Sequence, residues 1–146
     1  MVNVTYGITV CNEINEITTL VNFLHPRIQS DDEILIQYDE GGVTDDVMGY
    51  LRIINDLHTN VNVIGFPLNK DFASYKNNLK NHAKGIFIFQ IDADEVPNEY
   101  LITNMHDLLE SNKDIDLFFV PRVNTVEGLT DEHIQKWGWN VNDKGW

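Results

Sequence analysis

The sequence predicts a single α/β domain whose β-sheet is mostly parallel and carries helices on both faces. Two observations support this fold class. Short runs of β-branched and aromatic residues alternate with segments of helical periodicity along most of the 146 residues. Repeated strand and helix units of this kind build parallel sheets, because each helix carries the chain back across one face of the sheet. With 42% apolar residues, the chain can bury a core of ordinary size.

Four apolar runs have the length of buried strands, and apolar residues recur at helical spacing after each of the first three. The strands are expected at residues 4–10, 34–38, 61–66 and 86–90. The first helix should begin near Ile14 and end before Pro26. Thr44 can cap the second helix and Asp71 the third, and Gly85 ends the third helix before the fourth strand.

The last third of the chain is expected to be less regular. A helix is predicted from about residue 98 to residue 110, followed by a strand over residues 117–123. Pro121 would confine that strand to a sheet edge or an irregular end, because proline lacks a backbone N–H. The pattern breaks down from residue 124, so we expect a core over residues 1–123 and a tail over residues 124–146. The tail holds all three tryptophans, which could cover the sheet or form a homodimer interface.

Composition excludes several classes of partner. Ten basic residues against 23 acidic ones give a net charge of −13, which repels nucleic acids and anionic lipid surfaces. No run approaches the roughly 20 apolar residues of a membrane span, and no signal-peptide pattern opens the chain. The single cysteine, Cys11, excludes an internal disulfide and suits a reducing compartment. The sequence therefore predicts a soluble, cytoplasmic protein in which an anionic ligand needs a metal ion or a local basic group.

Asp92 and Asp94 follow the apolar run 86–90 directly, so they would leave the sheet together at the end of a strand. Paired carboxylates suit hard cations such as Mg²⁺ and Mn²⁺, which usually share their coordination shell with substrate phosphates. The alternative is an acidic turn that caps the next helix. The other strand ends, residues 10–13 and 38–40, would meet this motif in one crevice, because ligands of parallel sheets bind beyond the carboxyl ends of the strands.

Four short motifs in a fixed order carry a resemblance to a known family. They are residues 9–13 with Asn-Glu, residues 39–45 with an acid before a turn, Lys76-Asn77 running into residues 83–85, and Asp92-Ala93-Asp94. The chain resembles the GT-A glycosyltransferases of the large inverting group called family 2, whose last motif is the Asp-x-Asp signature. The resemblance implies a Rossmann-like GT-A sheet and a metal-dependent transfer of a sugar from a nucleotide-sugar, usually a UDP-sugar, to an acceptor with inversion.

The resemblance also implies roles for the matched positions. Asp39 would accept a hydrogen bond from the base of UDP, in a pocket shaped by Thr9, Cys11 and Glu13. Residues 92–94 would form a nucleotide-binding motif in which Ala93 lies between the two acids. Asp92 would lie near the ribose or the metal shell, and Asp94 would bind Mn²⁺ or Mg²⁺. Lys76 could place a positive charge at the phosphates. It could equally belong to a solvated helix face, because lysines recur at residues 76, 80 and 84.

Inverting transfer needs a general base that deprotonates the acceptor hydroxyl. In the family this acid usually lies farther beyond the Asp-x-Asp motif than this chain extends. Asp131 and Glu132 are the candidates here, although an acidic helix cap after Thr130 explains them equally well. The chain is therefore either a short glycosyltransferase or a truncated or degenerate module that holds a nucleotide-sugar with little transfer. A phosphatase is disfavoured, because its acidic motif would normally follow the first strand and not the fourth. A nucleotidyltransferase is disfavoured, because no Gly-rich, basic phosphate loop follows the first strand.

Overall fold

The computed structural model describes residues 3–123 and 128–139 of the chain. These residues fall into two compact units, Met1–Lys113 and Asp114–Trp146, which are described separately. The predicted α/β fold lies in the first unit. The predicted division of the chain into a nucleotide-sugar-binding core and a tail after residue 123 concerns function and stays a prediction.

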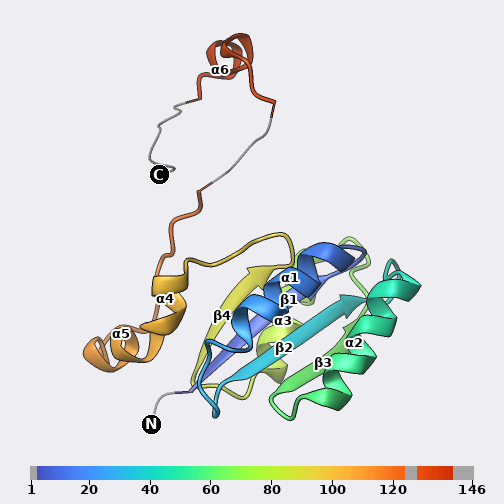
Figure 1. Ribbon diagram of the computed structural model, residues 1–146, viewed down its shortest axis with the longest axis vertical. Coiled ribbons are helices and arrows are strands. Elements are labelled where there is room, and N and C mark those ends of the chain that lie inside the picture. Colours follow the sequence, from blue (N-terminus) through green and yellow to red (C-terminus); the bar gives the residue numbers. More distant parts are fainter. Residues whose placement is uncertain (1–2, 124–127, 140–146) are drawn as a thin grey trace. The chain divides into compact units, whose positions relative to one another are not determined.

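The first unit is built on four parallel strands in the order β3-β2-β1-β4 (Figure 1). The strands are β1 (Val4–Val10), β2 (Glu33–Asp39), β3 (Val61–Phe66) and β4 (Phe87–Asp92). All four predicted strands are confirmed, within two residues at each end. The two central strands, β1 and β2, contribute the most buried residues, as expected for strands covered on both faces.

Three helices cover the sheet. α1 (Ile14–Leu24) and α2 (Asp45–Leu57) pack on one face, and α3 (Phe72–His82) packs on the other (Figure 1). The side chain of Asp71 accepts a hydrogen bond from the Ser74 N–H, so the predicted cap of α3 is confirmed. α2 begins directly after Thr44, also as predicted, although the Thr44 side chain makes no capping hydrogen bond.

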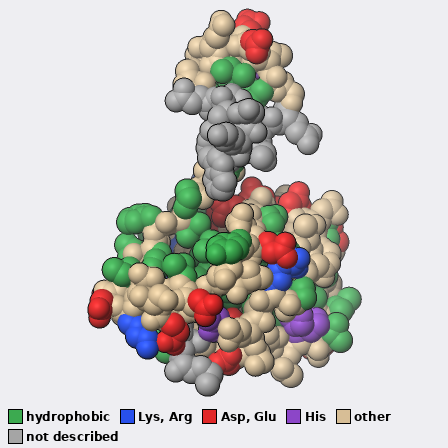
Figure 2. Space-filling model, turned by 60° about the vertical axis from the view of Figure 1, so that its left-hand side comes forward, with side chains coloured by type: hydrophobic (Ala, Val, Ile, Leu, Met, Phe, Trp, Pro, Cys, Tyr) green, Lys and Arg blue, Asp and Glu red, His purple; other side chains and the backbone are tan. Residues whose placement is uncertain are grey.

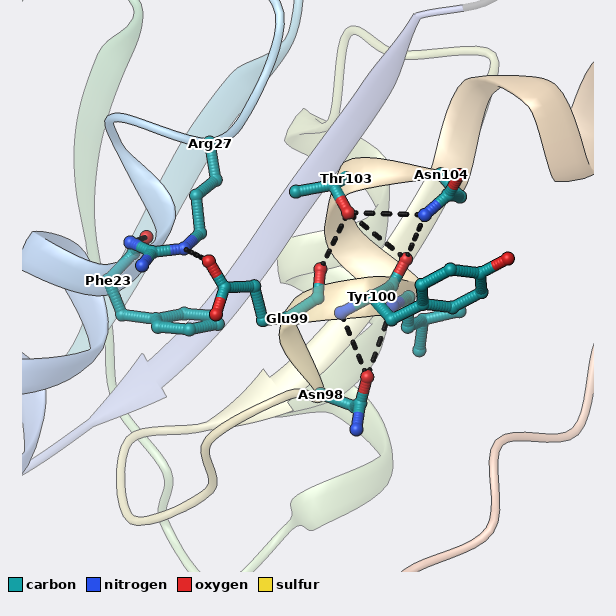
Figure 3. Close-up of polar contacts among 8 residues, drawn as sticks. Phe23, Arg27, Asn98, Glu99, Tyr100, Thr103 and Asn104 are labelled. Atoms are coloured by element: carbon teal, nitrogen blue, oxygen red, sulfur yellow. Dashed lines mark hydrogen bonds and ion pairs between the residues drawn. The ribbon is translucent and has the colours of Figure 1, made fainter.

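The helix predicted over residues 98–110 is two short helices, α4 (Glu99–Thr103) and α5 (Met105–Ser111). Asn98 caps α4 with its side-chain oxygen, which accepts from Tyr100 N at 2.9 Å (Figure 3). The helix breaks at Asn104, whose φ of −106° and ψ of 11° lie outside the helical range. Periodicity alone did not reveal this break, because buried residues continue on both sides of it.

Two polar contacts attach α4 and α5 to the rest of the first unit. Arg27, just beyond α1, lies over the Phe23 ring at 4.5 Å and pairs with Glu99 at 3.1 Å between Nε and Oε1 (Figure 3). Asp32 is buried and accepts from Val4 N at 2.9 Å, and His106 Nε2 lies 2.9 Å from the same oxygen. The Asp32 contact lies at Val4, the first residue of β1, at the opposite end of this strand from Thr9.

The second unit contains α6 (Asp131–Trp137), which ends at Gly138 with a left-handed φ of 64°. The strand predicted over residues 117–123 is absent, so that prediction is wrong. Phe119 is 92% exposed and Leu117 69% exposed. A strand needs a partner strand as well as a suitable composition, and no strand pairs with this segment within the described residues. None of the helices in residues 3–123 and 128–139 is long and apolar enough to cross a membrane.

Candidate functional site

The ends of β2, β1 and β4 lie side by side at one edge of the sheet, which we call the carboxyl edge. Thr9 pairs in register with Asp92, and Val10 pairs with Tyr38, the residue before Asp39. The ladder continues past the end of β4, because Ala93 N donates to Thr9 O at 3.1 Å. Residues more than 80 positions apart in the sequence therefore meet at the carboxyl edge, as the sequence predicted for these three strand ends.

Lys76 reaches the carboxyl edge from α3. Its Nζ lies 2.5 Å from Asp92 Oδ1 and 3.0 Å from the Thr9 hydroxyl oxygen. That hydroxyl in turn donates to Asp92 Oδ1 at 2.9 Å, which closes a three-residue network. The Lys76 side chain is 33% exposed and its ammonium group is in an ion pair with Asp92, whereas its role at the phosphates stays a prediction.

A buried polar residue of β2 fixes α3 in the position that presents Lys76. Gln37 is fully buried, and its side-chain nitrogen donates to Tyr75 O at 2.7 Å while its oxygen accepts from Asn78 at 2.8 Å. Burial, and then the charge of Asp39, raise the pKa of the Tyr75 hydroxyl well above its usual value. Sequence reasoning did not select Gln37; the available signal was one polar residue inside an apolar strand.

One side-chain oxygen of Asp39 links two loops by hydrogen bonds. Its Oδ1 accepts from Gly41 N at 3.1 Å and from Leu68 N at 2.9 Å, so it links the loop after β2 to the loop after β3. In the second loop, Asn69 and Lys70 have left-handed φ values of 45° and 63°, which non-glycine residues seldom adopt. Backbone strain of this kind gathers at binding sites, where the surrounding contacts maintain it.

Glu13 and Cys11 shape the loop after β1. Glu13 Oε2 accepts from Cys11 N at 2.8 Å and from Asn12 N at 3.0 Å, so this carboxylate orders the loop. Burial, followed by the charges of Asp39 and Glu13, raises the pKa of the Cys11 thiol. A thiol with a raised pKa is a poor nucleophile, which argues against a catalytic role for Cys11. Gly42 gives Cys11 space, because a Cβ there would lie 2.7 Å from Sγ.

The Asp-x-Asp motif forms a closed turn beyond β4. Glu95 N donates to Asp92 O at 2.9 Å, and the Glu95 carboxylate accepts from Asp92 N at 3.1 Å. Ala93 is buried and Asp94 is exposed. The turn thus separates the two acids: Asp92 joins the network of Lys76, while Asp94 faces solvent. The sequence did not indicate the structural role of Glu95, which depends on its side chain folding back.

The residues present fit a hard divalent cation that completes its shell with substrate oxygens. Within residues 3–123 and 128–139, no three His, Cys, Asp or Glu side chains are grouped so that they could hold a metal ion. Mg²⁺ and Mn²⁺ do not require such a cage, since one or two carboxylates together with phosphate oxygens and water suffice. Asp94 offers an exposed carboxylate, whereas one oxygen of Asp92 already binds Lys76 and Thr9.

Asp131 and Glu132, the candidates for the general base, occupy the first turn of α6 in the second unit. Thr130 caps this helix: its hydroxyl oxygen accepts from His133 N at 3.3 Å. Acids in a first helical turn interact favourably with the helix dipole, so a structural role accounts for both. His133 also stacks on Trp137 with ring centroids 4.9 Å apart. The catalytic role of Asp131 or Glu132 stays a prediction.

A family model described as glycosyl transferase family 2 matches residues 6–145, which is nearly the whole chain. The match includes every residue of the carboxyl edge described above. This chain belongs to glycosyl transferase family 2. No curated protein sequence matches it.

Solved structures share the fold of this family 2 chain. The structure of S. aureus TarS residues 1–349 aligns with a TM-score of 0.65 and 17% sequence identity. Structures of the same protein in complex with UDP and with UDP-GlcNAc align with TM-scores of 0.65 and 0.63, again at 17% identity. The alignment to TarS 1–349 covers 84% of this chain and 39% of the TarS chain. The family 2 chain therefore has a GT-A fold and spans well under half the length of these structures.

Proposed function

We propose that this chain is a metal-dependent glycosyltransferase that binds a UDP-sugar as its nucleotide-sugar donor and transfers the sugar to an acceptor hydroxyl with inversion. One observation carries the proposal: Lys76 binds Asp92 at the carboxyl edge while Asp94, two residues on, stays exposed. A cation and a separate carboxylate thus lie beside each other in an otherwise strongly acidic chain. The complexes of TarS with UDP and UDP-GlcNAc support UDP as the nucleotide.

Each side chain of the carboxyl edge has a part in this proposal. Asp39 and the loops that it joins receive the base, and Thr9, Cys11 and Glu13 form the wall beside it. Lys76 attracts the diphosphate, and Thr9 keeps Asp92 oriented toward Lys76. Ala93 is the buried residue of the turn that carries Asp94.

Asp94, with Asp92 beside it, would hold Mn²⁺ or Mg²⁺ together with the donor diphosphate. A bound divalent ion supplies charge neutralisation to the departing nucleoside diphosphate, which therefore needs no proton from an acid. Lys76 adds a fixed positive charge to the same region. The acceptor hydroxyl must lose a proton to a general base, for which Asp131 and Glu132 are the candidates in this chain.

A second candidate function is a donor-binding module with little or no transfer activity of its own. It is favoured by the share of TarS 1–349 that the chain covers, 39%, because acceptor contacts and a base would then come from elsewhere. Saturable UDP binding without transfer to any acceptor would identify this case. A cytoplasmic location and a homodimer stay predictions from the sequence.

The decisive experiment is a calorimetric titration of UDP, GDP, CDP and ADP with Mn²⁺ present and again with EDTA. We expect selective UDP binding that EDTA removes, and at least a tenfold loss of affinity in Asp94→Asn. Asp56→Asn changes another exposed acid, on α2, and should bind UDP like the parent protein. Full UDP affinity in Asp94→Asn with Mn²⁺ present would refute the assignment of Asp94.

A further inference from the structure

A pair of histidines joins the ends of α1 and α2. His25 directly follows α1 and His58 directly follows α2, and the centroids of their imidazole rings lie 3.9 Å apart with the planes inclined by 43°. Both residues are half-buried. α1 leads from the end of β1 back to the start of β2, and α2 leads from the end of β2 to the start of β3. The histidine pair therefore lies at the edge of the sheet opposite the carboxyl edge.

The ring nitrogens of this pair differ from those of the other histidines. The other three histidines each have a ring nitrogen in a hydrogen bond, with Asn78 for His82, Asp32 for His106 and Thr130 for His133. Within residues 3–123 and 128–139, the imidazoles of His25 and His58 contact each other, and neither ring has a hydrogen bond or an ion pair. Imidazole nitrogens without a protein partner are available as metal ligands.

The charge around the pair favours a cation. The C-terminal end of a helix carries partial negative charge, and two such ends meet here. Neither α1 nor α2 has a basic residue in its last turn, whereas α3 has Lys80 and His82 there. Arg27 donates to Phe23 O near the end of α1, but its ion pair with Glu99 offsets its charge. The net charge of −13 adds a general attraction for cations.

The spacing of the two rings suits one shared metal ion. Zn–N bonds of about 2.0–2.1 Å in a tetrahedral shell place two ligand nitrogens roughly 3.3 Å apart. Ring centroids 3.9 Å apart allow this spacing after small rotations of the two side chains. Imidazole suits Zn²⁺, Ni²⁺ and Cu²⁺, whereas Mg²⁺ and Mn²⁺ prefer oxygen ligands. In the part of the chain that the structure describes, no third His, Cys, Asp or Glu joins the pair, so water would complete the shell.

We propose that His25 and His58 form a second metal site, which binds a transition metal ion such as Zn²⁺ and clamps the ends of α1 and α2 together. An ion that binds both imidazoles requires the two helices to be packed side by side, so it stabilises the folded state. The site differs in chemistry from the exposed carboxylate of Asp94, which suits hard ions. The inference is independent of the proposed function, because neither histidine belongs to the carboxyl edge.

The test is a titration of Zn²⁺ into metal-free protein in the presence of excess Mg²⁺, which occupies carboxylate sites. Calorimetry compares the parent protein with His25→Ala and His58→Ala. His82→Ala is the matched control, because it removes an exposed histidine of α3 whose ring already has a partner. We expect one Zn²⁺ to bind with an affinity that falls at least tenfold in each of the first two variants and is unchanged in His82→Ala.

Two further measurements keep the outcome clear. In NMR spectra of the parent protein, the ring protons of His25 and His58 should shift together with Zn²⁺, which decides the matter even if a variant fails to fold. In urea unfolding, Zn²⁺ should raise the midpoint of the parent and of His82→Ala but not of the other two variants. Parent-like Zn²⁺ affinity in His25→Ala or His58→Ala, or ring shifts confined to one of the two histidines, would overturn the proposal. None of these results depends on whether UDP binds.

Discussion

Lys76 Nζ lies 2.5 Å from Asp92 Oδ1, and the Thr9 hydroxyl binds both side chains. This pair resolves a difficulty that the composition raises, because a chain of net charge −13 repels a diphosphate unless a local cation is present. The ion pair keeps that cation at the end of β4 before any ligand arrives.

Lys76→Met should weaken UDP binding at least tenfold, equivalent to about 1.4 kcal/mol, because it removes the positive charge that the proposed function places beside the diphosphate. The free energy of unfolding should change by less than about 1 kcal/mol, since exposed and half-exposed ion pairs contribute little. Calorimetry and urea unfolding measure the two effects. Lys80→Met, one turn farther along α3, is the control for overall charge. An equal loss of affinity in Lys80→Met would argue against a specific role of Lys76.

Gly42→Ala should weaken UDP binding about tenfold while the protein stays folded. A Cβ at Gly42 would lie 2.7 Å from Cys11 Sγ and 3.1 Å from Asp39 Oδ2, so both side chains must shift. Gly41→Ala is the matched control, because its Cβ would meet only Asp39 Oδ1 at an ordinary 3.6 Å. Calorimetry of the two variants checks the prediction, and unchanged affinity in Gly42→Ala would show that the base pocket lies elsewhere.

Alkylation of Cys11 should be slower at pH 8 than that of an unperturbed thiol, and it should accelerate as the pH is raised further. The reason is that burial, Asp39 and Glu13 raise the pKa of Cys11, so little reactive thiolate forms at pH 8. Asp39→Asn should increase the rate at fixed pH by lowering that pKa. Mass spectrometry after iodoacetamide treatment measures the rate cleanly, since the chain has one cysteine. Alkylation of the native protein at pH 7 as fast as in urea would contradict this account.

Gly85→Ala should destabilise the fold by about 1–3 kcal/mol or more through overpacking. A Cβ at Gly85 would lie 2.5 Å from Thr5 N and 2.8 Å from Phe87 O, which are backbone atoms that cannot move aside. Gly49→Ala on α2 meets nothing within 4 Å and should instead stabilise the protein by about 0.5–1 kcal/mol. Urea unfolding of both variants gives the comparison. A stable Gly85→Ala protein would mean that β1 and β4 can separate at this end.

The sequence predicted the sheet well because its strands are long apolar runs, each followed by a clear turn or cap. It failed where the outcome depends on contacts with other segments. Residues 117–123 have the composition of a strand, but strand formation requires a partner that composition does not reveal. The break at Asn104 depends on local backbone geometry inside a continuous apolar pattern.

The sequence predicted which strand ends form the candidate site, but it did not predict the hydrogen bonds and ion pairs between their side chains. Parallel topology alone places Thr9, Asp39 and Asp92 at one edge. Whether Lys76 reaches Asp92 depends on how far α3 slides along the sheet, which Gln37 determines from within β2. That Asp92 binds Lys76 while Asp94 faces solvent depends likewise on the turn that Glu95 closes.

The central position of β1 has a consequence for synthesis of the protein on the ribosome. β1 is made well before β4, with which it pairs, and Thr9 acquires its partner only when Asp92 has emerged. Closing a loop of this length is slow compared with pairing neighbouring segments. A nascent chain that stops before residue 87 would therefore lack Asp92 and Asp94, and the network of Thr9, Lys76 and Asp92 would form in one late step.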